Sequence, residues 1–289
     1  MISVVVPTTN EKKGLHSLKS AKKILGANMA EAILVLDNSS YESESFVVTE
    51  GLKVRVVRIC GLNGSYFARN QGAVHAKCDF LLFLDDGLDI EGEFDCGSLT
   101  PQVAFGASVK YRKAPVTAFE KWYFYKAFDI DGFIKRDHFI PTIFLFVSRQ
   151  VFFEVGCFNS AYKSSGDVEF CSRLVRSDVE LRKLNTVSVV TDLRNKSQIE
   201  RKIRRQVFGQ MIFSKNKGMY RFYVYNFKRL IANLLLLSGA SHKNGLDYLY
   251  ANSIICYWKV RCLLQGLLQP RKLDSYLTNA NVSEVNSDI

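Results

Sequence analysis

The chain has 289 residues, of which 47% are hydrophobic, and this suits one large domain or two small ones with an ample core. Its formal net charge of +11 indicates anionic partners such as phosphates, nucleic acid or acidic lipid. The composition excludes a wholly disordered chain, and no apolar run reaches the roughly 20 residues that a bilayer span needs.

The first 90 residues predict strands that alternate with helices, the order expected of a parallel sheet with helices on its faces. Ile2–Val6 is an apolar, β-branched run closed by Pro7, and the polar residues 8–11 can cap a helix over about residues 12–25. Because this strand follows Met1 at once, we expect no signal peptide. The later elements are strands at Ala32–Leu36, Val54–Ile59 and Phe80–Leu84, with one helix between the first two and another at Ser65–Ala76. Small residues recur every four positions in that last helix, at 68, 72 and 76, which predicts that it lies close on the sheet.

The strand at Phe80–Leu84 ends on two carboxylates, Asp85 and Asp86, with no spacer. Adjacent buried carboxylates repel each other and lose hydration, so they cost least where a cation or a polar ligand shares the site. In open α/β sheets that place is the crevice beyond the carboxyl ends of the strands. An acidic turn after a core strand is the alternative. The glycine motifs of dinucleotide folds and P-loops are absent from the sequence.

Residues 91–195 predict further strands at Val103–Val109, Ile143–Val147 and Glu180–Val190. Between the first two lies an aromatic cluster, which either lines a pocket or belongs to the core. Its members are Phe119, Trp122, Tyr123, Phe124, Tyr125 and Phe128. Seven cysteines without a Cys-x-x-Cys pair predict reduced thiols rather than disulfides or a zinc site.

Two more helices are expected in the same part of the chain. A short one covers Arg149–Val155 and is ended by Gly156. The other opens near Ser165 and runs to about residue 177, with Asp167 and Glu169 in its first turn. Ser165 or Asp167 can cap this helix, and its dipole favours negative charge there, so capping is the alternative to a functional role.

From Lys196 the pattern turns helical and basic, and residues 201–270 hold twelve Lys and Arg against Asp247 alone. Basic helices with Leu and aromatic faces suit an anionic membrane surface. The alternative is an amphipathic cap that packs on the rest of the protein. Residues 273–289 are polar and without pattern, which predicts a loose tail.

Several short motifs over about residues 1–215 together resemble the family 2 glycosyltransferases of the GT-A fold. Each motif alone is weak, but their order and spacing are specific. In chain order they are Pro7 with Asn10, Asp37-Asn38-Ser39-Ser40, Asn63-Gly64, Ala68-Arg69-Asn70, Phe83-Leu84-Asp85-Asp86, Val155-Gly156-Cys157-Phe158 and Asp167-Val168-Glu169-Phe170-Cys171 with Arg173.

The resemblance implies a GT-A-type α/β fold, a Rossmann-like mixed and mainly parallel sheet flanked by helices, with a C-terminal helical extension. It implies a nucleotide-sugar-binding half at residues 1–100 and an acceptor and catalytic half at residues 101–195. A basic helical extension at residues 196–272 and a flexible tail at residues 273–289 complete the expected organisation.

The resemblance also implies roles for individual residues toward a nucleotide-diphospho-sugar donor. Asp37 would accept from a base N–H, and Arg69 would place a fixed positive charge near the nucleotide. The full set of donor-binding residues is Pro7, Thr8, Asn10, Asp37, Asn63, Arg69, Asp85 and Asp86. The catalytic carboxylates are Asp167, as general base for an inverting attack, and Glu169. A divalent metal, Mg²⁺ or Mn²⁺, would be held by Asp86, Asp89 and Asp192.

Three positions depart from the family pattern. Gly87 stands where the metal motif usually ends in a second carboxylate, and Gly166 stands where a Glu is usual before Asp167. Asp192 stands after the last strand where many members carry a His. The departures at Gly87 and Asp192 change the set of ligands expected for the metal.

The expected function is sugar transfer to a saccharide or lipid-linked acceptor in polysaccharide or glycolipid synthesis. The enzyme is expected in the cytoplasm, with peripheral contact to the anionic inner face of the cell membrane. One alternative is a nucleotide-sugar-binding protein without catalysis. The other is a nucleic-acid-binding protein, but Asp37, Asp85, Asp86 and Asp167 would repel a polyanion.

Overall fold

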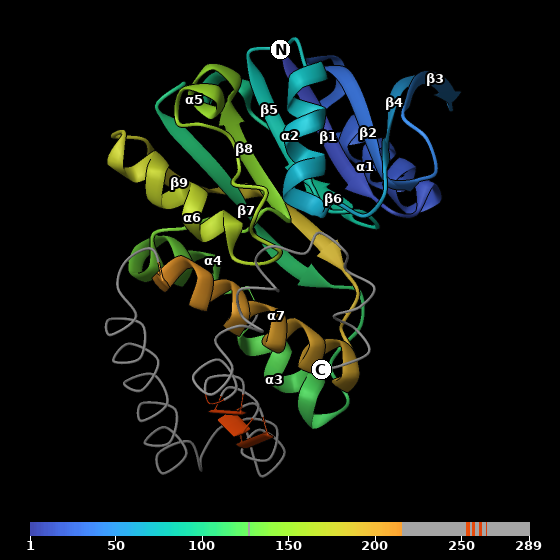
Figure 1. The fold of residues 1–289 in the computed structure, drawn as a ribbon. Helices are drawn as coiled ribbons and strands as arrows, with labels where there is room; N and C mark the ends of the chain where they lie inside the picture. The colour runs from blue at the N-terminus through green and yellow to red at the C-terminus, as the bar shows by residue number, and fades with distance from the viewer. Residues whose placement is uncertain (127, 216–252, 255, 258–259, 262–263, 265–289) are drawn as a thin grey trace.

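The computed structural model describes residues 1–126 and 128–215, together with residues 253, 254, 256, 257, 260, 261 and 264. Within them, nine strands form one mixed sheet in the order β3-β4-β2-β1-β5-β8-β7-β9-β6 (Figure 1). The strands are β1 (Ile2–Thr8), β2 (Met29–Ser39), β3 (Ser43–Thr49), β4 (Leu52–Cys60), β5 (Phe80–Leu84), β6 (Asp89–Gly92), β7 (Val103–Tyr111), β8 (Phe144–Ser148) and β9 (Glu180–Thr191).

Helices flank both faces of this sheet, which confirms the predicted α/β class (Figure 1). They are α1 (Glu11–Leu25), α2 (Ser65–His75), α3 (Ala118–Lys126), α4 (Ile130–Gly132), α5 (Arg149–Glu154), α6 (Gly166–Arg176) and α7 (Lys196–Lys215). Short helical turns at Gly26–Asn28, Cys96–Ser98 and Phe133–Asp137 complete the elements.

Alternation along the central strands builds two cores. Val4 and Val6 of β1 pack under α1 in one buried cluster, whereas Val5 packs under α2 in the other. Because β1 runs parallel to both β2 and β5, and β4 runs parallel to β2, the carboxyl ends of these strands lie at one edge. This edge is where an open α/β sheet binds its ligands.

The small residues of α2 let that helix lie close on the sheet, as predicted. A Cβ added at Gly72 would come within 2.3 Å of Val5 Cγ1 and 3.1 Å of Val35 Cγ2. Ala68 and Ala76 are also buried. The close approach fixes the start of α2 against the carboxyl ends of β1 and β2.

All seven predicted strands are present with slightly shifted ends, but two further strands escaped prediction. The helix expected between β2 and β4 was wrong, since β3 pairs antiparallel with β4 there. Glu50 and Gly51 have φ of 49° and 76° and form the two-residue turn of this hairpin. β3 lies at the sheet edge and has no buried residue. β6 has only four residues, too few to show an alternation of apolar and polar side chains.

Phe119 and Tyr123 of the predicted aromatic cluster are buried, so these two rings belong to packing rather than to a pocket. Tyr123 packs on Tyr111 and Phe128 at centroid distances of 6.0 and 6.2 Å. Lys202 of α7 lies over Tyr123 and Phe128, and its Nζ donates to the Tyr123 hydroxyl at 2.9 Å. α3 and α7 therefore lie side by side, with aromatic rings and lysine stems between them (Figure 1).

The basic extension predicted for residues 196–272 is described mainly through α7. Most of the remaining extension and the tail predicted at residues 273–289 lie outside the described residues. Of the helices that the structure does describe, none is long and apolar enough to cross a membrane.

Candidate functional site

Polar side chains from β1 and β5 meet at the carboxyl edge of the sheet. The Thr8 hydroxyl, at the end of β1, lies 2.5 Å from Asp86 Oδ2 just beyond β5. Asn10 caps α1 through a bond from the Lys13 amide to its Oδ1 at 3.2 Å, and its own amide donates to Thr8 Oγ1 at 2.9 Å. Pro7 is buried in β1 beside them. The structure thus gathers these predicted donor-binding residues in one place.

Asp37, at the end of β2, binds the turn before α2 rather than facing outward. Its Oδ1 accepts from the Asn63 amide at 2.8 Å, and its Oδ2 accepts from the Gly64 amide at 2.6 Å. The residue is only 5% exposed. Both oxygens position residues 63 and 64, and the role of Asp37 toward a base N–H stays a prediction. Lys163 joins the same turn by donating to the Asn63 carbonyl at 2.8 Å.

Arg69 was expected to meet the nucleotide, but the structure places its side chain beneath the site. It is 2% exposed, and its Nη2 forms an ion pair with Asp85 Oδ1. Asp85 itself is partly exposed. Arg69 therefore acts through Asp85, since it supports the charge of a carboxylate that can reach a ligand. Its buried Nε has no hydrogen-bond partner among the described residues.

Asp167 lies in the first turn of α6, held by a residue that sequence reasoning missed. The Tyr66 hydroxyl lies 3.3 Å from Asp167 Oδ1, and the Asp167 amide donates to that hydroxyl at 3.2 Å. Oδ1 also accepts from the Val168 amide at 3.0 Å. The second carboxylate oxygen, Oδ2, makes no hydrogen bond within the described part of the chain. Oδ1 is thus held by hydrogen bonds, whereas Oδ2 remains able to accept a proton.

The surroundings of Asp167 shift its acidity in the direction a base requires. Burial raises its pKa, and this outweighs the opposing effects of the Val168 amide, the Arg69 charge and the Tyr66 hydroxyl. Burial and the nearby Asp167 charge raise the pKa of Tyr66, which stays a neutral donor. The Arg69 guanidinium lies 5.8 Å from the Tyr66 ring, so Asp85, Arg69, Tyr66 and Asp167 form one connected set.

Gly166 explains how Tyr66 reaches Asp167. A Cβ at this position would lie 2.6 Å from Tyr66 Cε2, too close for any side chain. The departure noted at Gly166 therefore has a steric reason, because the ring of Tyr66 occupies the space. Its neighbour Ser165 has φ of 62° and makes no capping bond, so the expected serine cap is wrong. No local sequence signal links Tyr66 to Asp167, because the two residues lie 101 positions apart in the chain.

Glu169 is bound in an ion pair that holds a neighbouring loop. Its two oxygens each lie 2.8 Å from a nitrogen of Arg173, which also donates to the Val155 and Cys157 carbonyls. These contacts tie α6 to the end of α5. The geometry favours Asp167 over Glu169 as the reacting carboxylate.

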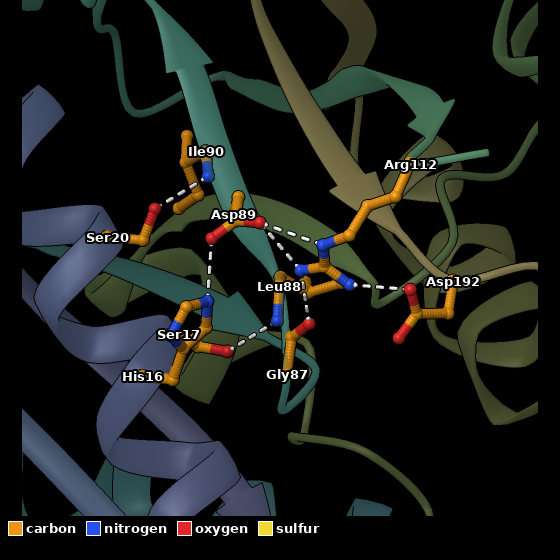
Figure 2. A network of polar contacts seen from close by, with 9 residues as sticks. All are labelled: His16, Ser17, Ser20, Gly87, Leu88, Asp89, Ile90, Arg112 and Asp192. Carbon is orange, nitrogen blue, oxygen red and sulfur yellow. Dashed lines mark hydrogen bonds and ion pairs between the residues drawn. The ribbon is translucent and has the colours of Figure 1, made fainter.

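The three residues assigned to a metal do not converge with free oxygens. Asp86 binds Thr8, whereas Asp89 and Asp192 both bind Arg112 (Figure 2). Across the residues that the structure describes, no three His, Cys, Asp or Glu side chains are grouped as a metal site. The metal set predicted from sequence is therefore not assembled.

One family of known proteins matches the N-terminal part of the chain. Residues 3–90 match the family described as glycosyl transferase family 2, and this span includes β1, β2, β4, β5 and the carboxylates at their ends. The chain thus resembles family 2 glycosyltransferases over these residues. A comparison with the sequences of curated proteins found no match.

A solved structure shows the same fold as this chain. A mannosyltransferase, PcManGT from Pyrobaculum calidifontis, in complex with GDP-Man and Mn²⁺, aligns with a TM-score of 0.60 at 13% identity. The alignment covers 92% of this chain and 86% of that one. S. aureus TarS aligns over 73% of this chain and 39% of its own, with 16% identity and a TM-score of 0.48.

Proposed function

We propose that this protein is a family 2 glycosyltransferase, which moves a sugar from a nucleotide-diphospho-sugar to a hydroxyl of a saccharide or lipid-linked acceptor, with inversion. The donor lies over the carboxyl ends of β1, β2 and β5, near Thr8, Asp85 and Asp86. The acceptor approaches from the side of α6. Such transfer serves polysaccharide or glycolipid synthesis, and a lipid-linked acceptor places the enzyme at the inner face of the cell membrane.

The proposal rests on the hydrogen bonds and the burial of Asp167. Tyr66 and Val168 bind its Oδ1, which leaves Oδ2 to accept the proton of an acceptor hydroxyl. Burial raises its pKa, which strengthens it as a base. The deprotonated acceptor oxygen attacks the anomeric carbon, and the bond to the nucleotide diphosphate breaks on the opposite face. The configuration at that carbon is therefore inverted.

The roles of the predicted donor residues divide into contact and support. Thr8, Asn10, Asp85 and Asp86 are at the edge, where Thr8 and Asn10 are proposed to contact the ribose and base, and Asp85 and Asp86 the ribose hydroxyls. Asp37 and Arg69 are buried supports, of the turn at Asn63 and of Asp85 respectively. The neighbouring mannosyltransferase was solved with Mn²⁺, but the carboxylates assigned here to a metal bind other side chains. No catalytic step is therefore assigned to a metal.

The test is turnover of labelled sugar nucleotides by the parent and by Asp167→Asn. We expect the variant to keep donor affinity and to lose roughly 10²–10⁴-fold in turnover, because an amide cannot take the proton. A screen of UDP-, GDP- and dTDP-sugars by thermal shift identifies the donor first, since a bound ligand stabilises the native state.

A stability measurement on the same variant excludes misfolding. The pKa of Asp167 is raised in the folded protein, so its stabilising contribution is present at low pH and is lost as pH rises through that pKa. The amide of Asp167→Asn cannot ionise, so at neutral pH the variant should melt no lower than the parent. Normal turnover in Asp167→Asn would contradict the base assignment. Donor binding without turnover in the parent would instead indicate a protein that has lost catalysis.

A further inference from the structure

Arg112, the residue after β7, lies between two of the carboxylates that the sequence assigned to a metal (Figure 2). Its Nε and Nη2 atoms lie 3.0 and 2.7 Å from Asp89 Oδ2, and its Nη1 lies 3.0 Å from Asp192 Oδ1. Nη2 also donates to the Gly87 carbonyl at 3.0 Å. One guanidinium therefore joins the turn after β5, the start of β6 and the end of β9.

The oxygens around Arg112 do not fit a divalent cation, which needs several free oxygens that converge. Asp89 has no free oxygen, since Arg112 binds Oδ2 and His16 Nε2 lies 2.6 Å from Oδ1. Burial opposes the charge of Asp89, but the hydrogen bonds from Arg112 and His16 hold its pKa below the usual value. A cation shared by Asp89 and Asp192 would have to displace a guanidinium of like charge.

Helix α1 holds the same turn from the other side. The Leu88 amide donates to Ser17 Oγ at 2.9 Å, and the Ile90 amide donates to Ser20 Oγ at 2.7 Å (Figure 2). The Gly87 amide donates to the Lys13 carbonyl at 3.1 Å, with Gly87 at φ of 71°. Arg112 supplies the bond on the opposite side, to the Gly87 carbonyl. The turn that follows Asp85 and Asp86 is thus fixed by protein groups alone.

We propose that Arg112 is a positioning residue of the donor site and takes the structural place of a protein-bound divalent cation there. This inference rests on the proposed function. A guanidinium stays charged at every working pH, and its planar fork binds carboxylates in a fixed geometry. It therefore keeps the turn beside Asp85 and Asp86 ready for the donor without a metal held by Asp89 and Asp192.

The first experiment titrates the parent protein with Mn²⁺ alone in a calorimeter and melts it with and without EDTA. We expect no binding of Mn²⁺ at micromolar concentrations and no change in melting temperature with chelator. The donor found by the thermal-shift screen should bind equally well in EDTA and in Mn²⁺. Tight Mn²⁺ binding that disappears in Asp89→Asn or Asp192→Asn would overturn the proposal.

The second experiment compares Arg112→Met, Arg112→Lys and the control Lys110→Met. Lys110 is also a cation near the end of β7 and bridges to Glu91 at 3.1 Å, but that pair is exposed. Losing a charged hydrogen-bond network should raise the donor KM of Arg112→Met about tenfold or more, with a smaller change in kcat. Arg112→Lys should recover part of this loss, and Lys110→Met should match the parent.

A gain of metal binding is the readout that a merely structural role would not produce. Arg112→Met releases the carboxylates of Asp89 and Asp192, so Mn²⁺ should now bind this variant and lower its donor KM. The parent should show neither effect. If Arg112→Met behaves like Lys110→Met, the proposal is wrong. If no sugar nucleotide binds the parent at all, the proposed function fails, while the Mn²⁺ titrations still decide the role of Arg112.

Discussion

Asp167, the proposed base, illustrates how a carboxylate depends on a residue far away in the chain. Its position after Gly166 was visible in the sequence, but its hydrogen bonds come from Tyr66 in α2. Tyr66 is buried, and its own raised pKa keeps it protonated. Tyr66 therefore holds Oδ1 of Asp167 as a neutral donor and lowers a pKa that burial raises.

We predict that Tyr66→Phe moves the pH dependence of turnover. Without the hydroxyl, the pKa of Asp167 rises further, so the base is deprotonated only at higher pH. The ascending limb of the pH–rate profile should shift upward, and turnover near neutral pH should fall roughly tenfold. Profiles of kcat against pH measure both effects.

Tyr111→Phe is the matched control, since the Tyr111 hydroxyl is buried without a hydrogen-bond partner among the described residues. It removes the same atom but touches no catalytic group, so its profile should match that of the parent. An unshifted profile in Tyr66→Phe would show that the hydroxyl does not act on the base.

Local sequence signals pointed to candidate residues that the structure places at one edge of the sheet, but the hydrogen-bond partners of these residues could not be predicted. Asp37, Asp85 and Asp86 follow apolar strands, so their common edge follows from strand direction alone. Burial and long-range contact are different, because no short period in the sequence encodes them. Arg69 is a buried support and Asp37 binds a turn, and each depends on how α2 packs across the sheet. The proposed role of Arg112 likewise depends on β6, one of the two strands that were not predicted.

At the scale of elements, the packing of α2 on β1 and β2 brings Tyr66 and Arg69 to the site. The four-residue spacing of small side chains predicted this close packing, and the structure confirms it at Gly72. Strand prediction failed where burial is weak, in β3 at the edge and in β6. The mixed sheet was predictable from buried strands, whereas its exposed edges were not.

We predict that Gly72→Ala displaces α2 from the sheet. The added methyl would lie 2.3 Å from Val5 Cγ1, and β-branched neighbours cannot rotate away freely. Overpacking of this kind should lower the free energy of unfolding by about 1–3 kcal/mol. Urea denaturation measures that loss, and donor affinity should fall with it because α2 carries Arg69.

Val74→Ala on the same helix is the control, because Val74 is 60% exposed. Its free energy of unfolding should change by less than about 0.5 kcal/mol. Equal stability of the two variants would show that α2 can shift without cost. In that case the close packing would not be what positions Tyr66 and Arg69.

For the whole molecule, charge is divided between the carboxylates at the edge of the sheet and a basic sequence that begins with α7. The edge gathers Asp85, Asp86, Asp89 and Asp167, whereas α7 begins a stretch with twelve Lys and Arg over residues 201–270. In α7, Lys196 and Lys202 lie over the rings of Phe119 and Tyr123. These two lysines therefore pack on α3, as the cap interpretation expects. Arg201 on the same helix is exposed.

The last prediction is that the intact protein binds anionic membranes peripherally. Basic, Leu-rich and aromatic segments associate with acidic lipid through charge and apolar contact, with about 1 kcal/mol for each cation near the surface. The protein should float with anionic vesicles at low salt and be released as salt screens the charges. Neutral vesicles should leave it behind, and a chain ended after residue 215 should lose flotation while α7 remains. If the intact protein ignores anionic vesicles at low salt, the basic segment is a cap, and a lipid-linked acceptor loses its main support.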